Sequence, residues 1–281
     1  MRQVLLFGTS GNPPTGRDGH SGIVDYFVTL GRFDEIWILP VYQHMFSAKR
    51  NAMADQGAPT YEDRIEMCRL AFENYSTASC RVRVLRTEQE VYTEIQNSNK
   101  TGEAATAPTR SCTYDVVQYL QERNPDVEFS FLLGTDTYYD VRKGKWRKSA
   151  ELMKMVSFVI VDRLGVRPET EDLLAGVETH HPPFLTDVSS TKVRNARAED
   201  FMEGTMTVES SVLQYMKDHR LYGFGRQSRL ERMVMLATDR CSSMFSDERR
   251  WMVLAGIAVS VGVIRVVSRL RKGGTGGCPF H

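Results

Sequence analysis

FGTSGNPPTGRDGH, residues 7–20, joins a short hydrophobic run to an amphipathic segment through a loop rich in glycine and proline. Val4–Phe7 has the apolar character of a buried strand, and Ser21–Leu30 has the spacing of a helix. Fourteen residues with four glycines and two prolines are too many for an ordinary turn. After the first strand of a doubly wound sheet, such a loop lies at the carboxyl edge, where ligands bind.

Outward from this loop, strand and helix patterns alternate along the chain. Apolar or alternating runs predict four further strands: Glu35–Pro40, Arg81–Leu85, Val127–Gly134 and Val156–Arg163. Helical spacing occurs within Thr60–Tyr75 and Ser111–Leu120, whereas the small polar residues of Asn97–Thr109 predict a loop. Strands separated by helices predict an α/β fold with a Rossmann-like, doubly wound parallel sheet, which we assign to residues 1–224.

The composition excludes several classes of protein. A chain of 281 residues that is 41% hydrophobic and 25% charged is an ordinary globular protein. Its formal net charge of +1 gives no reason to expect a nucleic-acid partner. The five cysteines are scattered without metal-ligand spacing, so we expect reduced thiols, a cytosol-facing protein and no metal site. Met1–Gln3 lead directly into the first strand, so no secretory signal is expected.

The glycine-rich loop is suited to binding a phosphate. Glycines such as Gly8 and Gly19 let the backbone approach the anion, and the following helix directs free N–H groups and a partial positive charge toward it. His20, where the helix begins, can donate a hydrogen bond to a phosphoryl oxygen, and Thr15 adds a hydroxyl. The loop is neither GxGxxG nor GxxxxGK[ST], so neither a dinucleotide fingerprint nor a P-loop is indicated.

A second candidate anion site lies late in the chain, in DVSSTKVRNA at Asp187–Ala196. The hydroxyls of Ser189, Ser190 and Thr191 at a helix N-terminus can surround an anion. Arg194, one turn later, supplies a guanidinium that matches phosphate oxygens. Helix capping alone is the alternative explanation. The presence of two such segments in one chain favours a shared phosphate ligand.

These two motifs together resemble those of the nicotinate/nicotinamide mononucleotide adenylyltransferase family, which belongs to the nucleotidyltransferases with (H/T)xGH and SSTxxR signatures. The resemblance covers residues 1–223, where EIWILPVYQHMFSAKR, SCTYDVV, FLLGTDTYYDVRKGKW and YMKDHRLYG are similar to further family segments in the same order. One departure is the spacing of Thr15 and His20, which is two residues longer than in the family pattern and adds Arg17 and Asp18. We align Gly19-His20 with the family's GH pair.

The resemblance implies a nucleotidyltransferase fold with a C-terminal helical tail, and transfer of the adenylyl group of ATP to nicotinate or nicotinamide mononucleotide. In that reaction His20, with Thr15, contacts the α-phosphate, while Ser190, Thr191 and Arg194 hold the β- and γ-phosphates. Mg²⁺ arrives with ATP and needs no dedicated protein ligands. Pyrophosphate leaves without a covalent enzyme intermediate.

Further ATP-site candidates lie on other loops at the same sheet edge. They are Gly8, Thr9 and Gly19 of the first loop, Lys49 after the second strand, and Gly134 and Asp136 beyond a later strand. A solvated loop lysine is the alternative explanation for Lys49, and a plain turn residue is the alternative for Asp136.

The mononucleotide is expected to contact two other positions. Trp146 is flanked by Lys143, Lys145, Arg147 and Lys148, which pull it to the surface and favour stacking on the pyridine ring. Thr113, at a helix start, is expected to receive the pyridine carboxylate or amide, although capping explains Thr113 nearly as well. The sequence does not choose between the nicotinate and nicotinamide forms.

The C-terminal tail differs in charge and in hydrophobic pattern from the rest of the chain. Residues 225–281 contain ten Lys/Arg and four Asp/Glu. Residues 225–248 predict an amphipathic helix, and Trp251–Val267, within 249–272, is apolar on every side except Arg265. With its basic flanks this run predicts a membrane anchor, similar to the tails of mitochondrial outer-membrane proteins. Residues 273–281 are a flexible glycine-rich end. The alternative is a helical hairpin against the domain.

Two other functions remain open at this point. One is adenylyl transfer to another phosphate, such as phosphopantetheine, against which Trp146 and the SCTYD segment argue. The other is a catalytically weakened, nucleotide-binding scaffold tethered to a membrane, which the enlarged loop at Gly16–Asp18 favours.

Overall fold

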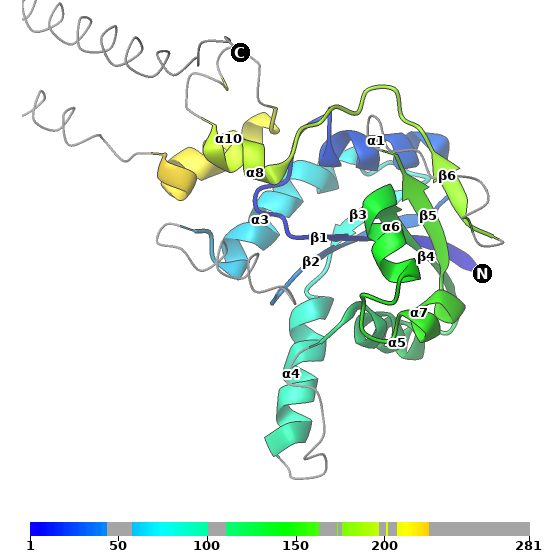
Figure 1. Cartoon of the computed structure of the whole chain (residues 1–281). Coiled ribbons are helices and arrows are strands. Elements are labelled where there is room, and N and C mark those ends of the chain that lie inside the picture. The colour runs from blue at the N-terminus through cyan, green and yellow to red at the C-terminus, as the bar shows by residue number, and fades with distance from the viewer. Residues whose placement is uncertain are drawn as a thin grey trace, which may run out of the picture. The chain divides into compact units, whose positions relative to one another are not determined.

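The protein is described here from a computed structural model, which defines residues 1–43, 58–100, 111–162, 173, 176–196, 201 and 207–224 (Figure 1). The chain divides into two units, Met1–Phe224 and Gly225–His281. The second unit, and with it the predictions for 225–248, 249–272 and 273–281, lies outside the described residues. Among the helices that are described, none combines the length and the apolar character needed to cross a bilayer.

Strands and helices alternate along most of the first unit. The strands are β1 (Arg2–Thr9), β2 (Glu35–Pro40), β3 (Arg81–Val84), β4 (Val127–Gly134), β5 (Ser157–Val161) and β6 (Glu178–His180). The longer helices are α1 (His20–Leu30), α3 (Tyr61–Phe72), α4 (Thr87–Lys100), α5 (Thr113–Arg123), α6 (Thr135–Arg142) and α10 (Ser210–Asp218). The shorter ones are η1 (Glu73–Tyr75), α7 (Ser149–Met155), α8 (Ser190–Asn195) and η3 (Leu221–Gly223).

The six strands form one parallel sheet in the order β3-β2-β1-β4-β5-β6. The chain runs outward from β1 to β3 on one side, then returns to place β4 against the other side of β1. In register, Phe7 pairs with Ile38 of β2 and with Leu132 of β4, so the carboxyl ends of these strands lie level. The order therefore reverses between β1 and β4, which is where doubly wound sheets bind their ligands.

Two hydrophobic layers cover the sheet, one on each face (Figure 1). Along β1, Leu5 and Phe7 face the layer that includes α1, α3 and α10, whereas Val4 and Leu6 face the layer of α4, α5, α6 and α7. All four side chains are buried, which is why β1 is a continuous apolar run without alternation. The predicted Rossmann-like parallel sheet is confirmed.

Most element ends shift by a few residues from the prediction, and two larger differences concern α4 and β6. The helix α4 continues through Lys100, so the loop predicted from Asn97 is wrong for 97–100, and 101–109 lie outside the described residues. Among the side chains of α4 that the structure describes, Thr87 and Val91 are buried and Ile95 packs partly against the core. The helix therefore has only a narrow apolar stripe from which it could be predicted. The strand β6 was not predicted, since three residues are too few for a pattern.

Candidate active site

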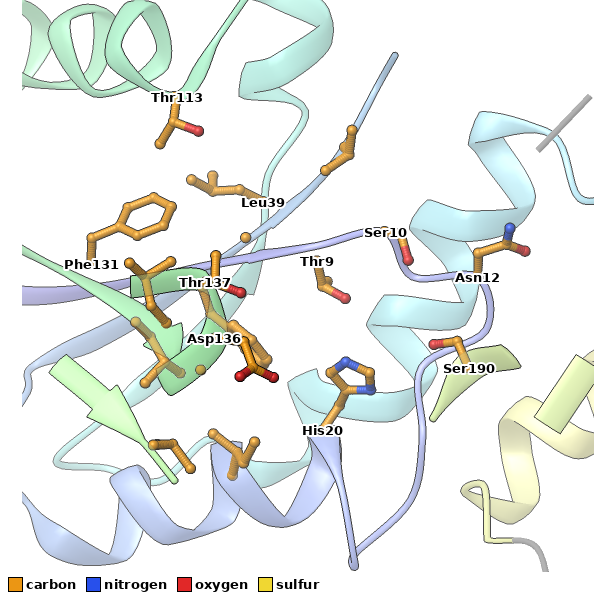
Figure 2. Close-up of a pocket in the computed structure, with 18 of the residues that line it drawn as sticks. Thr9, Ser10, Asn12, His20, Leu39, Thr113, Phe131, Asp136, Thr137 and Ser190 are labelled. Carbon is orange, nitrogen blue, oxygen red and sulfur yellow. The ribbon is translucent and has the colours of Figure 1, made fainter. Parts of the chain in front are cut away.

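A cavity of about 470 Å³ opens at the carboxyl edge of the sheet (Figure 2). Its floor consists of the ends of β1, β2, β4 and β5, including Phe7–Thr9, Leu39, Phe131–Gly134 and Val161. Helix starts and loops form its walls, and these supply His20, Glu88, Thr113, Asp136 and Arg194. The cavity thus lies at the point where the strand order reverses.

The two motifs at opposite ends of the domain sequence are in direct contact. Ser190 Oγ, at the start of α8, donates a hydrogen bond to the carbonyl oxygen of Pro13 at 2.8 Å. Arg194 donates to the carbonyl oxygen of Asn12 at 2.6 Å. His20, Ser190, Thr191 and Arg194 all line the cavity, and Figure 2 shows Ser190 beside the loop that carries Asn12. The predicted meeting of the glycine-rich loop and the SSTxxR segment is therefore present.

Hydrogen bonds to Thr15 fix the orientation of His20. The backbone N–H of Thr15 donates to His20 Nδ1 at 3.1 Å, and Thr15 Oγ1 lies 2.7 Å from the same nitrogen. Thr15 Oγ1 also accepts from the backbone N–H of His20 at 2.9 Å. Because an amide N–H can only donate, Nδ1 is an acceptor, and a neutral His20 carries its proton on Nε2. The imidazole is thereby prepared to donate from Nε2.

Thr15 is placed differently from the expectation that its hydroxyl contacts a phosphate. Its side chain is 1% exposed and is not among the residues that line the cavity. Gly19 does not line it either: a Cβ there would collide with Thr15 Oγ1 and with Val188. Both residues instead position His20: Thr15 holds the imidazole by hydrogen bonds, and Gly19 permits the close packing that brings Thr15 to it.

The two additional residues of the first loop point in different directions. Asp18 accepts hydrogen bonds from the hydroxyls of Thr186, at 3.0 Å, and of Thr207. Arg17 is exposed, with its guanidinium 5.7 Å from the centre of the Tyr75 ring. The longer loop is therefore anchored to segments that precede α8 and α10, and His20 still reaches the cavity.

Gly8, Thr9, Gly134 and Asp136 line the cavity as predicted. Thr9 Oγ1 accepts from the N–H of Gly11 at 3.2 Å, which closes a turn directly after β1. Gly11 has φ of 57°, a conformation that suits glycine. Asp136, in the first turn of α6, is exposed and is shown in Figure 2. Lys49 lies outside the described residues.

Thr113 and Trp146 also line the cavity, and an ion pair holds their segments together. Asp115 of α5 accepts from the backbone N–H of Cys112 at 2.8 Å and pairs with Arg147. The cap of α5 is thus formed by Cys112 and Asp115, so capping does not account for Thr113. Trp146 is half-buried and packs partly against the core of α5 to α7, which leaves it neither a core residue nor a fully exposed one.

Arg64 also contributes to the site and was not among the predicted residues. It is 3% exposed, and its guanidinium donates to the carbonyl oxygens of Ser10 at 2.8 Å and of Val41 at 2.6 Å. It therefore ties the loop after β1 to the loop after β2. The signal was present, because Arg64 shares one helical stripe with the apolar residues Cys68 and Ala71, where a charge needs a buried partner.

Glu88, in the first turn of α4, was also missed. It lines the cavity, and burial raises the pKa of its carboxyl to about 7, opposed by a backbone hydrogen bond from Tyr42 and by the charge of Arg64. In the sequence Glu88 is one of several acidic residues on a polar helix, so only its tertiary position distinguishes it. The part of the chain that the structure describes contains no group of three His, Cys, Asp or Glu residues that could hold a metal ion.

Comparisons with known proteins agree with this geometry. The cytidylyltransferase-like family matches residues 7–196. The probable nicotinate-nucleotide adenylyltransferase of Oceanobacillus iheyensis is 24% identical over 230 residues, which cover 80% of this chain and 100% of the relative. The enzyme of the same name from Bacillus pumilus is 28% identical over 224 residues, which cover 79% and 99%.

The fold is also found among solved structures. Plasmodium falciparum nicotinic acid mononucleotide adenylyltransferase complexed with NaAD superposes with a TM-score of 0.58 at 18% identity, covering 81% of this chain and 100% of that one. The same enzyme complexed with APC gives a TM-score of 0.59 at 17% identity. These likenesses confirm the shared fold. Since the family match spans more than half of the residues and includes both phosphate motifs, the chain belongs to the cytidylyltransferase-like family, within the nucleotidyltransferases.

Proposed function

We propose that this enzyme transfers the adenylyl group of ATP to nicotinate mononucleotide or nicotinamide mononucleotide, releasing pyrophosphate and forming the dinucleotide. The observation that carries the proposal is the contact of Ser190 and Arg194 with the loop that presents His20, because it gathers the phosphate-binding groups around one cavity. The names of the relatives favour nicotinate mononucleotide as the first substrate to test.

Catalysis is proposed to consist of positioning and charge stabilisation. A 5′-phosphate oxygen of the mononucleotide attacks the α-phosphorus of ATP, a new P–O bond forms, and the bond to the pyrophosphate breaks. His20 donates from Nε2 to a non-bridging α-phosphate oxygen, where negative charge increases in the transition state. The N-terminus of α1 adds its partial positive charge at the same place. Thr15 acts as a positioning residue, since it holds the imidazole through Nδ1.

The remaining lining residues divide between the two substrates. Thr191 and Arg194, which are hydrogen-bonded to each other at 3.0 Å, hold the β- and γ-phosphates together with Ser190. Asp136 accepts from ribose hydroxyls of ATP. Trp146 stacks on the pyridine ring, and Thr113 faces the ring substituent.

Mg²⁺ is proposed to enter with ATP. The described residues offer no cage for it, and phosphate oxygens and waters are the ligands Mg²⁺ usually keeps at such sites. The ion would neutralise charge on the triphosphate, and no side chain of this chain is assigned to it.

The test is an assay of the purified full-length chain with ATP and each mononucleotide in turn, with phosphopantetheine as the competing acceptor. We expect dinucleotide and pyrophosphate with a pyridine mononucleotide, and a loss of at least about 100-fold in kcat for His20→Ala. His219→Ala is the matched control, because His219 is exposed, stacks on Tyr215 and does not line the cavity. ATP binding without pyrophosphate release would instead support the scaffold function.

We also propose, from the sequence alone, that Trp251–Val267 anchors the enzyme in an intracellular membrane with its catalytic domain facing the cytosol. The support is a seventeen-residue apolar run between Arg249-Arg250 and Arg269, close to the minimum length of a span. Extraction of membranes with alkaline carbonate is the test. Release of the full-length chain into the supernatant would refute the anchor without affecting the proposed reaction.

A further inference from the structure

The last turn of the described domain has an unusual backbone. Arg220 and Tyr222 have φ of 54° and 52°, values that side chains with a Cβ rarely adopt, and Gly223 follows with φ of 87°. Tyr222 nevertheless packs against the core formed by α1, α3 and α10. A residue held in this conformation must be stabilised by tertiary contacts.

The hydroxyl of Tyr222 reaches the phosphate loop. It donates to Asn12 Oδ1 at 2.7 Å, although the two residues are 210 positions apart. Asn12 is 3% exposed and lines the cavity beside Ser10, as Figure 2 shows. Burial raises the pKa of Tyr222 well above its ordinary value, so the hydroxyl remains a donor across the working pH range.

Asn12 is at the same time the anchor of Arg194. Its carbonyl oxygen accepts from the Arg194 guanidinium at 2.6 Å, and the next carbonyl, of Pro13, accepts from Ser190. Asn12 is therefore held by Tyr222 through its side chain and holds Arg194 through its main chain. Without the tyrosine hydroxyl, a buried amide oxygen loses its partner, and the peptide that orients Arg194 is free to turn.

We propose that Tyr222 is a positioning residue for triphosphate binding, acting through Asn12 on Arg194. This inference rests on the proposed function, since it assumes that Arg194 faces the β- and γ-phosphates. It predicts that replacing Tyr222 weakens the binding of ATP and leaves the binding of the mononucleotide unchanged. The pyridine half of the cavity, with Thr113 and Trp146, lies on other elements, and within the described part of the chain neither residue takes part in these hydrogen bonds.

The experiment compares Tyr222→Phe with Tyr215→Phe in the full-length chain. Tyr215 is the matched control, because its hydroxyl donates to Asp63 at 2.9 Å and neither residue lines the cavity. Tyr222→Phe should weaken ATP binding about tenfold, measured by calorimetry, and raise the KM for ATP equally, while the KM for the mononucleotide changes less than about twofold. Tyr215→Phe should leave ATP affinity unchanged.

Several outcomes would overturn the inference. One is an equal rise in both KM values with a fall in Tm, which is the signature of a merely structural role. Unchanged ATP affinity is another. If Tyr222→Phe does not fold, Asn12→Ala decides the matter by the same ATP titration, where unchanged affinity refutes the proposal. If no mononucleotide is adenylylated but ATP binding still weakens in Tyr222→Phe alone, the proposed reaction fails and the inference about Tyr222 stands.

Discussion

The two halves of the cavity, which we propose bind the phosphates and the pyridine ring, are assembled in different ways. In the phosphate half, the loop after β1 and the helix α8 are short contiguous motifs that bond directly to each other, from Ser190 to Pro13 and from Arg194 to Asn12. In the proposed pyridine half, Thr113 and Trp146 come from two separate segments, the start of α5 and the loop before α7, which the Asp115–Arg147 ion pair joins. Binding an anion requires backbone N–H groups and close approach, which a contiguous stretch can supply, whereas enclosing a ring requires walls from several elements.

The largest expected effect in this comparison comes from Arg194→Ala. Removing the guanidinium takes away both the proposed phosphate ligand and the hydrogen bond to Asn12, so kcat/KM for ATP should fall at least about 100-fold. The KM for the mononucleotide should remain close to that of the parent. Arg194→Lys is the control, because it keeps the charge but not the planar guanidinium. Its kcat/KM for ATP should lie between those of the parent and of Arg194→Ala. Steady-state kinetics with each substrate varied separately provide the measurement, and an equal loss toward both substrates would contradict the division into halves.

Trp146→Ala should weaken the binding of the mononucleotide in the proposed pyridine half of the cavity. Loss of stacking on the pyridine ring should raise the KM for the mononucleotide about tenfold and leave the KM for ATP within about twofold. Trp146 also packs partly against the core, so Trp146→Phe, which keeps a ring face and most of the packing, serves as the control for stability. A change in both KM values that follows a fall in Tm would mean that Trp146 only supports the structure.

The difference between the halves also explains how far the sequence could be used. The apolar runs of β2 and β4 predicted their strands to the residue, because strands buried on both faces have no other place in a fold. His20, Ser190 and Arg194 could be predicted because each stands in a motif with its neighbours. Arg64 and Glu88 were not assigned a role, since a charged residue on a helix is usually solvated. The apolar stripe that Arg64 shares indicates its burial in the sequence, whereas for Glu88 only the tertiary structure places the carboxyl in the cavity wall.

Thr15 shows that even within a motif the sequence does not predict the direction of a side chain. Its residue type predicts a hydroxyl near the phosphate loop, and the hydroxyl is there, but the two extra residues before His20 leave its direction open. In the structure it points at the imidazole, and Asp18 anchors the added residues to Thr186 and Thr207. Spacing identifies which residues belong together, whereas direction depends on contacts with segments that are far away in sequence.

The smallest expected effect concerns Glu88, the half-buried acid of the cavity wall. Burial raises its pKa from the ordinary 4.5 to about 7, so in this interval the folded state retains a proton that the unfolded state releases. Stability should therefore fall as the pH rises from about 4.5 to about 7 and then level off, by at most about 3 kcal/mol. Arg64 and the Tyr42 backbone oppose this shift, and Tyr61 of α3 stays uncharged throughout the interval because burial raises the pKa of its hydroxyl.

Glu88→Gln removes the titrating group, so the variant should lose less stability than the parent between pH 5 and pH 8. Glu90→Gln, on the same helix but exposed, is the matched control and should follow the parent curve. Urea unfolding at several pH values measures the difference, in which the titration of all other groups cancels. If the Glu88→Gln and parent curves run parallel, the carboxyl is hydrated and the wall near α4 is open to solvent. If they diverge, this part of the cavity is a low-dielectric wall, in contrast to the phosphate half, where hydrogen-bond donors converge on the loop after β1.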